Sequence, residues 1–156
     1  MKKKLISAIC IIILLIGLIL IRKLEYLFYD PFLYYFKSEF HHKPLPNFDF
    51  LRLFASHFFR FSLNSTLSLA IIYCWFKDDS ITKFSFVVYC IAFIFFSTIY
   101  FGMIYAKFPL GYMPFFYVRR FIIQPLLLLL LIPSIIFYKS EAKKRSRTIK
   151  NKKATF

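Results

Sequence analysis

The sequence has little of what a soluble domain of this size contains. Of its 156 residues only 3 are glycine, 7 are proline, 3 are cysteine and 7 are acidic. Charged residues make up 19% of the chain, whereas soluble domains carry about 25%. So few cysteines exclude a disulfide scaffold, and so little glycine and proline excludes a collagen-like or low-complexity chain.

What the chain does contain is apolar and aromatic. Hydrophobic residues make up 60% of it, with 23 Phe and 11 Tyr, and they gather in four runs, at 5–21, 58–76, 84–105 and 121–138. Each run approaches the roughly 20 residues that a helix needs to cross a bilayer. Only helices satisfy their own backbone groups there as single segments. The sequence therefore predicts an all-α integral membrane protein with four transmembrane helices in one domain, 1–138.

The positive charge lies mainly at the two ends of the chain. The formal net charge is +15; Lys2, Lys3 and Lys4 supply three charges, and the tail 139–156 holds eight basic residues against one glutamate. Basic segments beside membrane spans stay in the cytoplasm. We therefore expect both ends in the cytoplasm, with membrane lipids as partners. We expect no nucleic-acid partner, because no recognition motif accompanies the charge.

The first apolar run differs from a secretory signal peptide. It has 17 residues and is followed by Arg22 and Lys23, with no pair of small residues to mark a cleavage site. Signal peptides have apolar regions of about 7–15 residues that end at such a site. The run is therefore predicted to be an uncleaved first helix.

Neither the cysteines nor the histidines form a metal or redox pattern. The three cysteines are isolated within the predicted spans, where we expect them to behave as small buried hydrophobes. They are Cys10, Cys74 and Cys90. His41 and His42 are adjacent, so their side chains diverge, and no Cys or carboxylate follows either of them at i+3 or i+4. We predict no metal site and no cofactor.

The loop before the second run is strongly aromatic. Asp30-Pro31 matches a helix start, with Asp as the N-cap and Pro at the first helical position. A short amphipathic helix at 31–40, with Phe, Tyr and Lys side chains, suits the membrane interface. We favour lipid contact for this segment; a protein-docking surface is the alternative.

The second run carries a polar stripe. His57, Arg60, Asn64 and Ser68 fall within an arc of about 80° on a helical wheel. Polar side chains on a membrane helix face protein or a wet cavity. Arg60 lies close enough to the outer boundary to extend toward the interface instead. For Asn64 a structural interhelical hydrogen bond and a functional pocket are equally compatible with the sequence.

The fourth run opens with two arginines on the predicted outer side. Arg119 and Arg120 run against the positive-inside bias there, which indicates an anionic partner. Gln124 lies one turn after Arg120, and Pro125 should kink the helix and free a nearby carbonyl. We therefore predict a binding site for an anion, or for a polar segment of a partner. Its residues are His57, Arg60, Asn64, Arg119, Arg120 and Gln124.

Three segments resemble the exosortase F system-associated membrane proteins of flavobacteria. They are LEYLFYDPFLYYFK (24–37), RFSLNSTLSLAIIY (60–73) and YVRRFIIQP (117–125). The resemblance spans roughly 1–138 and implies motif positions at Arg60, Asn64, Arg120 and Gln124. It implies a multi-pass protein of the bacterial inner membrane that assists an exosortase, a membrane enzyme for C-terminal sorting signals. The expected partners are the exosortase and its sorted substrates.

Catalysis is the weaker hypothesis. None of the seven acids lies inside a predicted span, so acid–base chemistry in the membrane would depend on His57 alone. The chain also lacks the H-E-x-x-H motif of membrane metalloproteases and the G-x-S-x-G motif of serine hydrolases. We expect a non-enzymatic accessory protein. The alternatives are a small transporter or lipid- or anion-binding subunit, and a morphogenesis scaffold.

Overall fold

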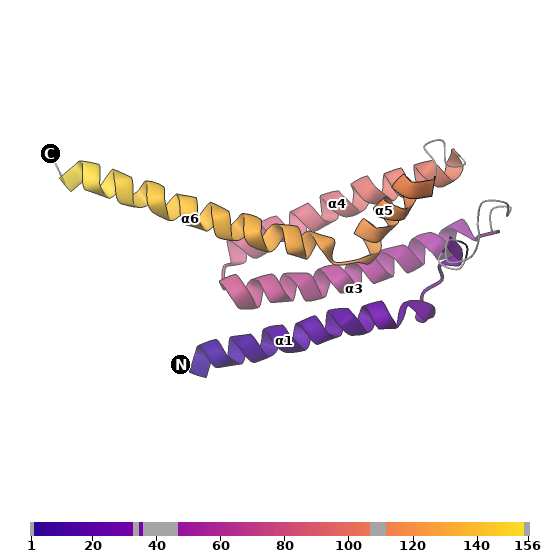
Figure 1. Ribbon diagram of the computed structural model, residues 1–156, viewed down its shortest axis with the longest axis horizontal. Helices are drawn as coiled ribbons and strands as arrows, with labels where there is room; N and C mark the ends of the chain where they lie inside the picture. Colours follow the sequence, from indigo (N-terminus) through magenta and orange to yellow (C-terminus); the bar gives the residue numbers. More distant parts are fainter. Residues whose placement is uncertain (1, 33–34, 36–46, 107–111, 155–156) are drawn as a thin grey trace.

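The described part of the chain consists of helices joined by short non-helical stretches. The computed structural model describes residues 2–32, 35, 47–106 and 112–154, and among these there is no strand. Figure 1 shows the elements: α1 (Lys2–Lys23), the short 3-10 helix η1 (Glu25–Leu27), α3 (Phe50–Phe76), α4 (Asp79–Tyr105), α5 (Tyr112–Ile123) and α6 (Leu126–Ala154). The predicted all-α class is confirmed.

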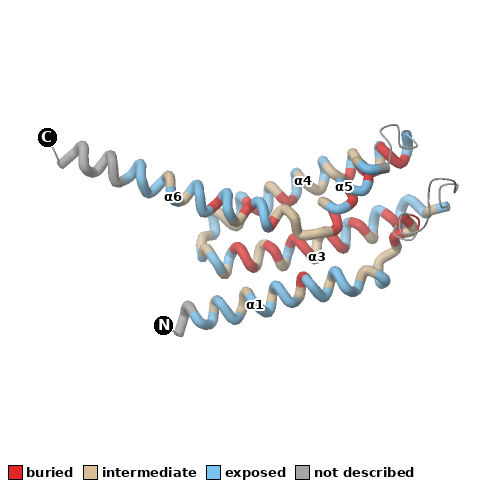
Figure 2. The backbone as a smooth tube through the Cα atoms, viewed as in Figure 1, coloured by how far each residue is buried: buried red, intermediate tan, exposed pale blue. Residues whose placement is uncertain are grey.

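The helix α3 is the centre of the arrangement. It packs against α1 along one side and against α4 and α5 on others, and Figure 1 shows α1, α3 and α4 side by side. Of the described side chains of α1, only Leu18 is buried, whereas α3 buries nine (Figure 2). The face of α3 with the polar stripe is therefore covered by protein, and α1 is left on the outside.

A tight turn joins α3 to α4. Lys77 adopts a left-handed conformation (φ 50°, ψ 44°), and its N–H donates to the carbonyl of Tyr73. Asp78 then caps α4, because its carboxylate accepts from the backbone N–H groups of Ser80 and Ile81. Figure 1 shows the start of α1, this turn and the end of α6 toward the same side of the view. We call that side the hairpin end.

The fourth predicted span, 121–138, is broken near its start. The helices α5 and α6 meet at Gln124-Pro125 with a bend of 68° between them, which confirms the kink predicted from Pro125. Proline lacks an N–H, so the helix cannot continue through it without losing a hydrogen bond. Beyond the break α6 runs as one helix through the basic tail to Ala154.

Two helices are long and apolar enough to cross a membrane alone, Leu5–Lys23 and Asp79–Tyr105, and a third span is possible if the bent pair counts as one. These match three of the four predicted spans. The remaining predicted span, 58–76, lies within α3. Among the described residues α3 is not one of the helices that qualify as candidate spans. Its Arg52, Arg60, Asn64 and serines reduce its hydropathy. Four spans are thus not confirmed by length and composition.

At the other end of the bundle the core is aromatic. Phe32, Tyr100 and Phe115 are fully buried there, and their rings meet with centroids 4.7–6.5 Å apart. We call this the aromatic end. Residues 31, 32 and 35 of the predicted interfacial helix are helical, and the rest of 31–40 lies outside the described residues. The side chains of Phe32 and Tyr35 are buried in protein and do not face lipid as we had favoured.

Candidate functional site

An ion pair fixes the segment after η1 to α5. The guanidinium of Arg119 donates to Oδ2 of Asp30 from Nη2 at 2.5 Å and from Nε at 3.1 Å. Both residues are buried, with 8% and 7% exposure. Two charge-assisted bonds in a site shielded from water are strong and directional. This contact joins residues 89 positions apart, so it sets how the loop closes over the helices.

A second contact closes the break between α5 and α6. The side-chain amide of Asn64 donates from Nδ2 to the backbone carbonyl of Ile123 at 2.7 Å. In an unbroken helix that carbonyl would accept from the N–H four residues later, which the break prevents. Of the two roles that the sequence left open for Asn64, the structure has the interhelical hydrogen bond. A carbonyl left unpaired inside a membrane would cost several kcal/mol.

His57 is held in a defined orientation on α3. Its Nδ1 lies 2.9 Å from the carbonyl oxygen of Leu53, so Nδ1 carries the proton because the carbonyl can only accept. The ring also packs on Tyr100, with centroids 4.8 Å apart. The other ring nitrogen, Nε2, is buried without a hydrogen-bond partner. In the neutral ring this nitrogen is a free acceptor.

Arg60 lies one turn further along α3 and is equally buried. Only 3% of the residue is exposed, and its guanidinium carbon lies 5.2 Å from the centroid of the Phe28 ring, a cation–π contact. Its Nε has no acceptor. The side chain therefore does not extend to the interface, which the sequence had left open. It is enclosed by Phe28 and by the Asp30–Arg119 region.

These side chains surround one narrow crevice. It has an empty volume of about 150 Å³ and is too tight to hold a water molecule. Its walls are Phe28, Asp30, Ser56, His57, Arg60 and Ile123. We call Asp30, His57, Arg60, Asn64 and Arg119 the buried polar centre. In this structure the centre is a set of internal contacts and not an open cavity.

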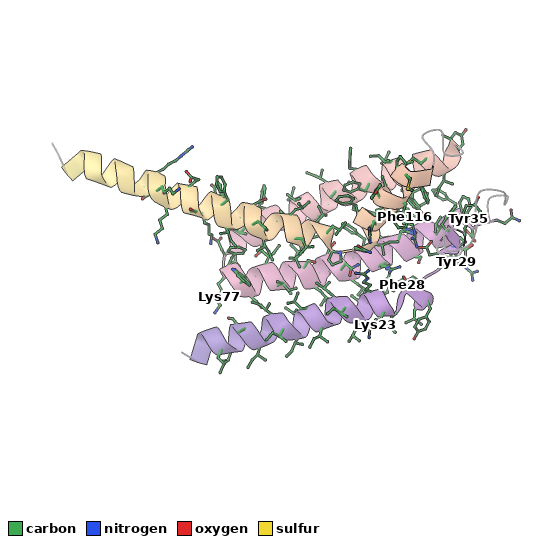
Figure 3. The ribbon with its side chains drawn as sticks, viewed as in Figure 1. Lys23, Phe28, Tyr29, Tyr35, Lys77 and Phe116 are labelled. Carbon is green, nitrogen blue, oxygen red and sulfur yellow. The ribbon has the colours of Figure 1, made fainter. Side chains whose placement is uncertain are left out.

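The other two predicted site residues lie apart from this centre. Arg120 is exposed, and its guanidinium lies over the ring of Phe116, 5.6 Å from the centroid. Gln124 is half-buried at the break, where its backbone N–H donates to the carbonyl of Arg120. Figure 3 shows Phe116 and Phe28 toward the aromatic end and Lys77 at the hairpin end. The structure thus brings four of the six residues together.

One member of the centre, Asp30, was not among the predicted site residues. The Asp-Pro pattern predicted a helix N-cap at Asp30, and residues 31 and 32 are helical; the pattern gave no sign that the same carboxylate binds Arg119. A signal was available, because Asp30 lies in an aromatic loop that was predicted on the same side of the membrane as Arg119 and Arg120. Burying an arginine requires an anionic partner. The chain itself supplies one for Arg119.

The cysteines are less uniform than predicted. Cys10 on α1 and Cys74 on α3 are half-buried with their sulfurs 3.5 Å apart, while Cys90 is exposed on α4, contrary to the expectation that all three are buried. The described residues contain no group of three His, Cys, Asp or Glu side chains able to hold a metal ion. His41 and His42 lie outside the described residues.

Comparisons of the chain with protein-family models, with curated proteins and with solved structures find no match.

Proposed function

We propose that this chain is a non-enzymatic accessory subunit of an exosortase-type protein-sorting complex in the bacterial inner membrane. The proposal depends on one observation: the three segments that carry the family resemblance meet at the buried polar centre. The first supplies Phe28 and Asp30, the second Arg60 and Asn64, and the third Arg119 and Ile123. This meeting supports the proposal, because the three segments that carry the resemblance also build one buried centre.

The chemistry of the centre supports an accessory role. Arg119 is neutralised by Asp30, and Asn64 is bonded to the backbone at the break. Polar groups bonded in this way hold helices in one arrangement. Such an arrangement presents fixed surfaces to a neighbouring membrane protein. Exposed apolar side chains of α1 and α4 are available for contact with lipid or with a partner helix, among them Ile13, Ile94 and Phe95.

We further propose four spans with both termini in the cytoplasm. The supporting observation is the position of α3, whose 27 residues make a helix about 40 Å long. It is packed against α1, α4 and α5, so its polar residues face protein, where a membrane helix tolerates them. The bent pair α5–α6 is then the fourth span, and its broken backbone is covered by Asn64.

A second function, the binding of a lipid or another anion, is favoured by two atoms. Arg60 Nε and His57 Nε2 are buried without partners in the same crevice. Buried polar atoms in proteins are normally hydrogen-bonded, and a further group bound in the crevice would supply the missing partners of these two.

The accessory role is tested by isolating the tagged chain from its native membranes in mild detergent. We expect an exosortase to co-isolate with it at a defined ratio, and a tagged four-span protein from the same membranes to bring none. Recovery of well-folded chain without any exosortase would overturn the accessory role. It would leave the binding role unaffected, because that role concerns the isolated chain.

A further inference from the structure

An apolar groove lies directly beside the crevice that contains Arg60. It has a volume of about 380 Å³ and runs between the end of α1, η1 and α3. Its walls are Ile21, Leu24, Leu27, Phe28, Tyr29, Ser56, Phe59 and Leu63. Phe28 and Ser56 line both the groove and the crevice. The two spaces are therefore separated only by side chains that they share.

The crevice offers one donor and one acceptor that nothing in the described structure uses. Arg60 Nε–H lacks an acceptor, and His57 Nε2 lacks a donor, because Nδ1 of the same ring already donates to Leu53. Arg60 lies in the field of three charges, attractive from Asp30 and Glu25 and repulsive from Arg119. Both hydrogen bonds from Arg119 go to Oδ2 of Asp30, and Nε of Arg60 has no hydrogen-bond partner.

We propose that this groove and crevice form a phospholipid site, with an acyl chain in the groove and the lipid phosphate bound to Arg60. Arginine is the side chain best suited to a phosphate, because its planar N–H donors match the phosphate oxygens. The apolar groove argues for an amphiphile in place of a free anion. A headgroup hydroxyl, as in phosphatidylglycerol, would donate to Nε2 of His57.

Phe28 is the side chain that must move for the phosphate to enter. It is half-buried, covers the guanidinium of Arg60 at 5.2 Å, and lies in a non-helical stretch between η1 and residue 31. Its neighbour Asp30 is fixed to Arg119, so a rotation of Phe28 opens the crevice without displacing the loop. The lipid phosphate would then replace the ring as the partner of Arg60. The site deepens the binding role proposed above and does not depend on the accessory role.

The test uses the full chain, purified in detergent, delipidated and titrated with dioleoylphosphatidylglycerol under native mass spectrometry. We expect one tightly bound lipid in the wild type and about tenfold weaker binding in Arg60→Gln, the loss typical of one hydrogen bond to a charged group. Dioleoylglycerol has the same acyl chains and no phosphate. It should bind to the wild type as weakly as phosphatidylglycerol binds to Arg60→Gln. Arg120→Gln, which removes the exposed arginine next to Arg119 on α5, should bind phosphatidylglycerol like the wild type.

A second variant covers the case in which Arg60→Gln fails to fold, as judged by its helical circular dichroism. Ser56→Leu leaves every charge in place but adds bulk at the wall between groove and crevice, and we expect it to weaken binding to a similar extent. Equal lipid binding by the wild type and both variants would overturn the site. So would displacement of the lipid by millimolar inorganic phosphate, because the site would then recognise a free anion.

Discussion

The Asp30–Arg119 pair allows the sharpest test of the buried polar centre. Removing one member of a buried ion pair leaves the other charge without compensation and costs about 3–5 kcal/mol. Asp30→Asn keeps the shape and one acceptor oxygen, so we expect the lower end of that range, about 3 kcal/mol. For a chain of 156 residues, a loss of that size lowers the melting temperature by roughly 6–12 °C. The assay is thermal unfolding in detergent, followed by circular dichroism.

Matched controls separate the pair from a general effect of charge. Asp79→Asn removes an exposed carboxylate from the first turn of α4, and Arg120→Gln removes the exposed arginine next to Arg119; each should shift the melting temperature only slightly. In a double-mutant cycle, Asp30→Asn together with Arg119→Gln should cost clearly less than the sum of the single changes. Additive effects, or a single change no larger than its control, would refute the pairing.

The remaining predictions concern three other contacts. Asn64→Ala should destabilise the chain by about 1–3 kcal/mol in the same assay, because it leaves the carbonyl at the α5–α6 break unpaired; an unchanged melting temperature would contradict that bond. Mild oxidation with copper phenanthroline should join Cys10 to Cys74 within one chain. The product is a faster gel band that a reductant reverses and that Cys10→Ser abolishes. A disulfide to Cys90 instead would show that α1 does not pack on α3 as described. Lys139 lowers the pKa of Asp78 below its ordinary value of 3.8 through a hydrogen bond. The contact therefore stabilises the fold fully at pH values above 3.8, and this stabilisation is lost as the pH falls through the lowered pKa. The melting-temperature difference between wild type and Asp78→Asn should therefore be constant from about pH 5 to 8 and shrink below about pH 4, and a difference that changes near pH 7 would assign the effect to another group.

The sequence did not predict that α3 begins at Phe50 or that α5 begins at Tyr112. That the four apolar runs are helical did follow from it, because the length and apolar character of a run decide this locally. The kink at Pro125 was equally local, since proline lacks the N–H whatever surrounds it. The stripe of His57, Arg60 and Asn64 on one face of α3 was also predictable, because it depends only on helical geometry. The structure buries all three.

What could not be predicted were the partners of those side chains. Whether Arg119 or Arg120 turns inward depends on the rotation of α5, and that rotation is fixed by packing against α3 and α4. Asp30 is 89 residues from Arg119, and no local pattern joins residues so distant in the chain. The Asp30-Pro31 pattern predicted a helix start, and residues 31 and 32 are helical, but such a local pattern does not reveal the tertiary ion pair of Asp30. The apolar groove beside Arg60 likewise exists only once α1 and α3 are packed together.

The most direct test of the account is whether α3 crosses the membrane, because the buried polar centre has its proposed role only if α3 is a span. Single cysteines introduced at Asn47 and at Asp79, both exposed and just outside the ends of α3, can be labelled with a membrane-impermeant maleimide. The background carries serine at all three natural cysteines. The account predicts that Asn47→Cys is labelled in intact cells and that Asp79→Cys is labelled only after the membrane is permeabilised. Labelling of both positions from the same side would contradict it.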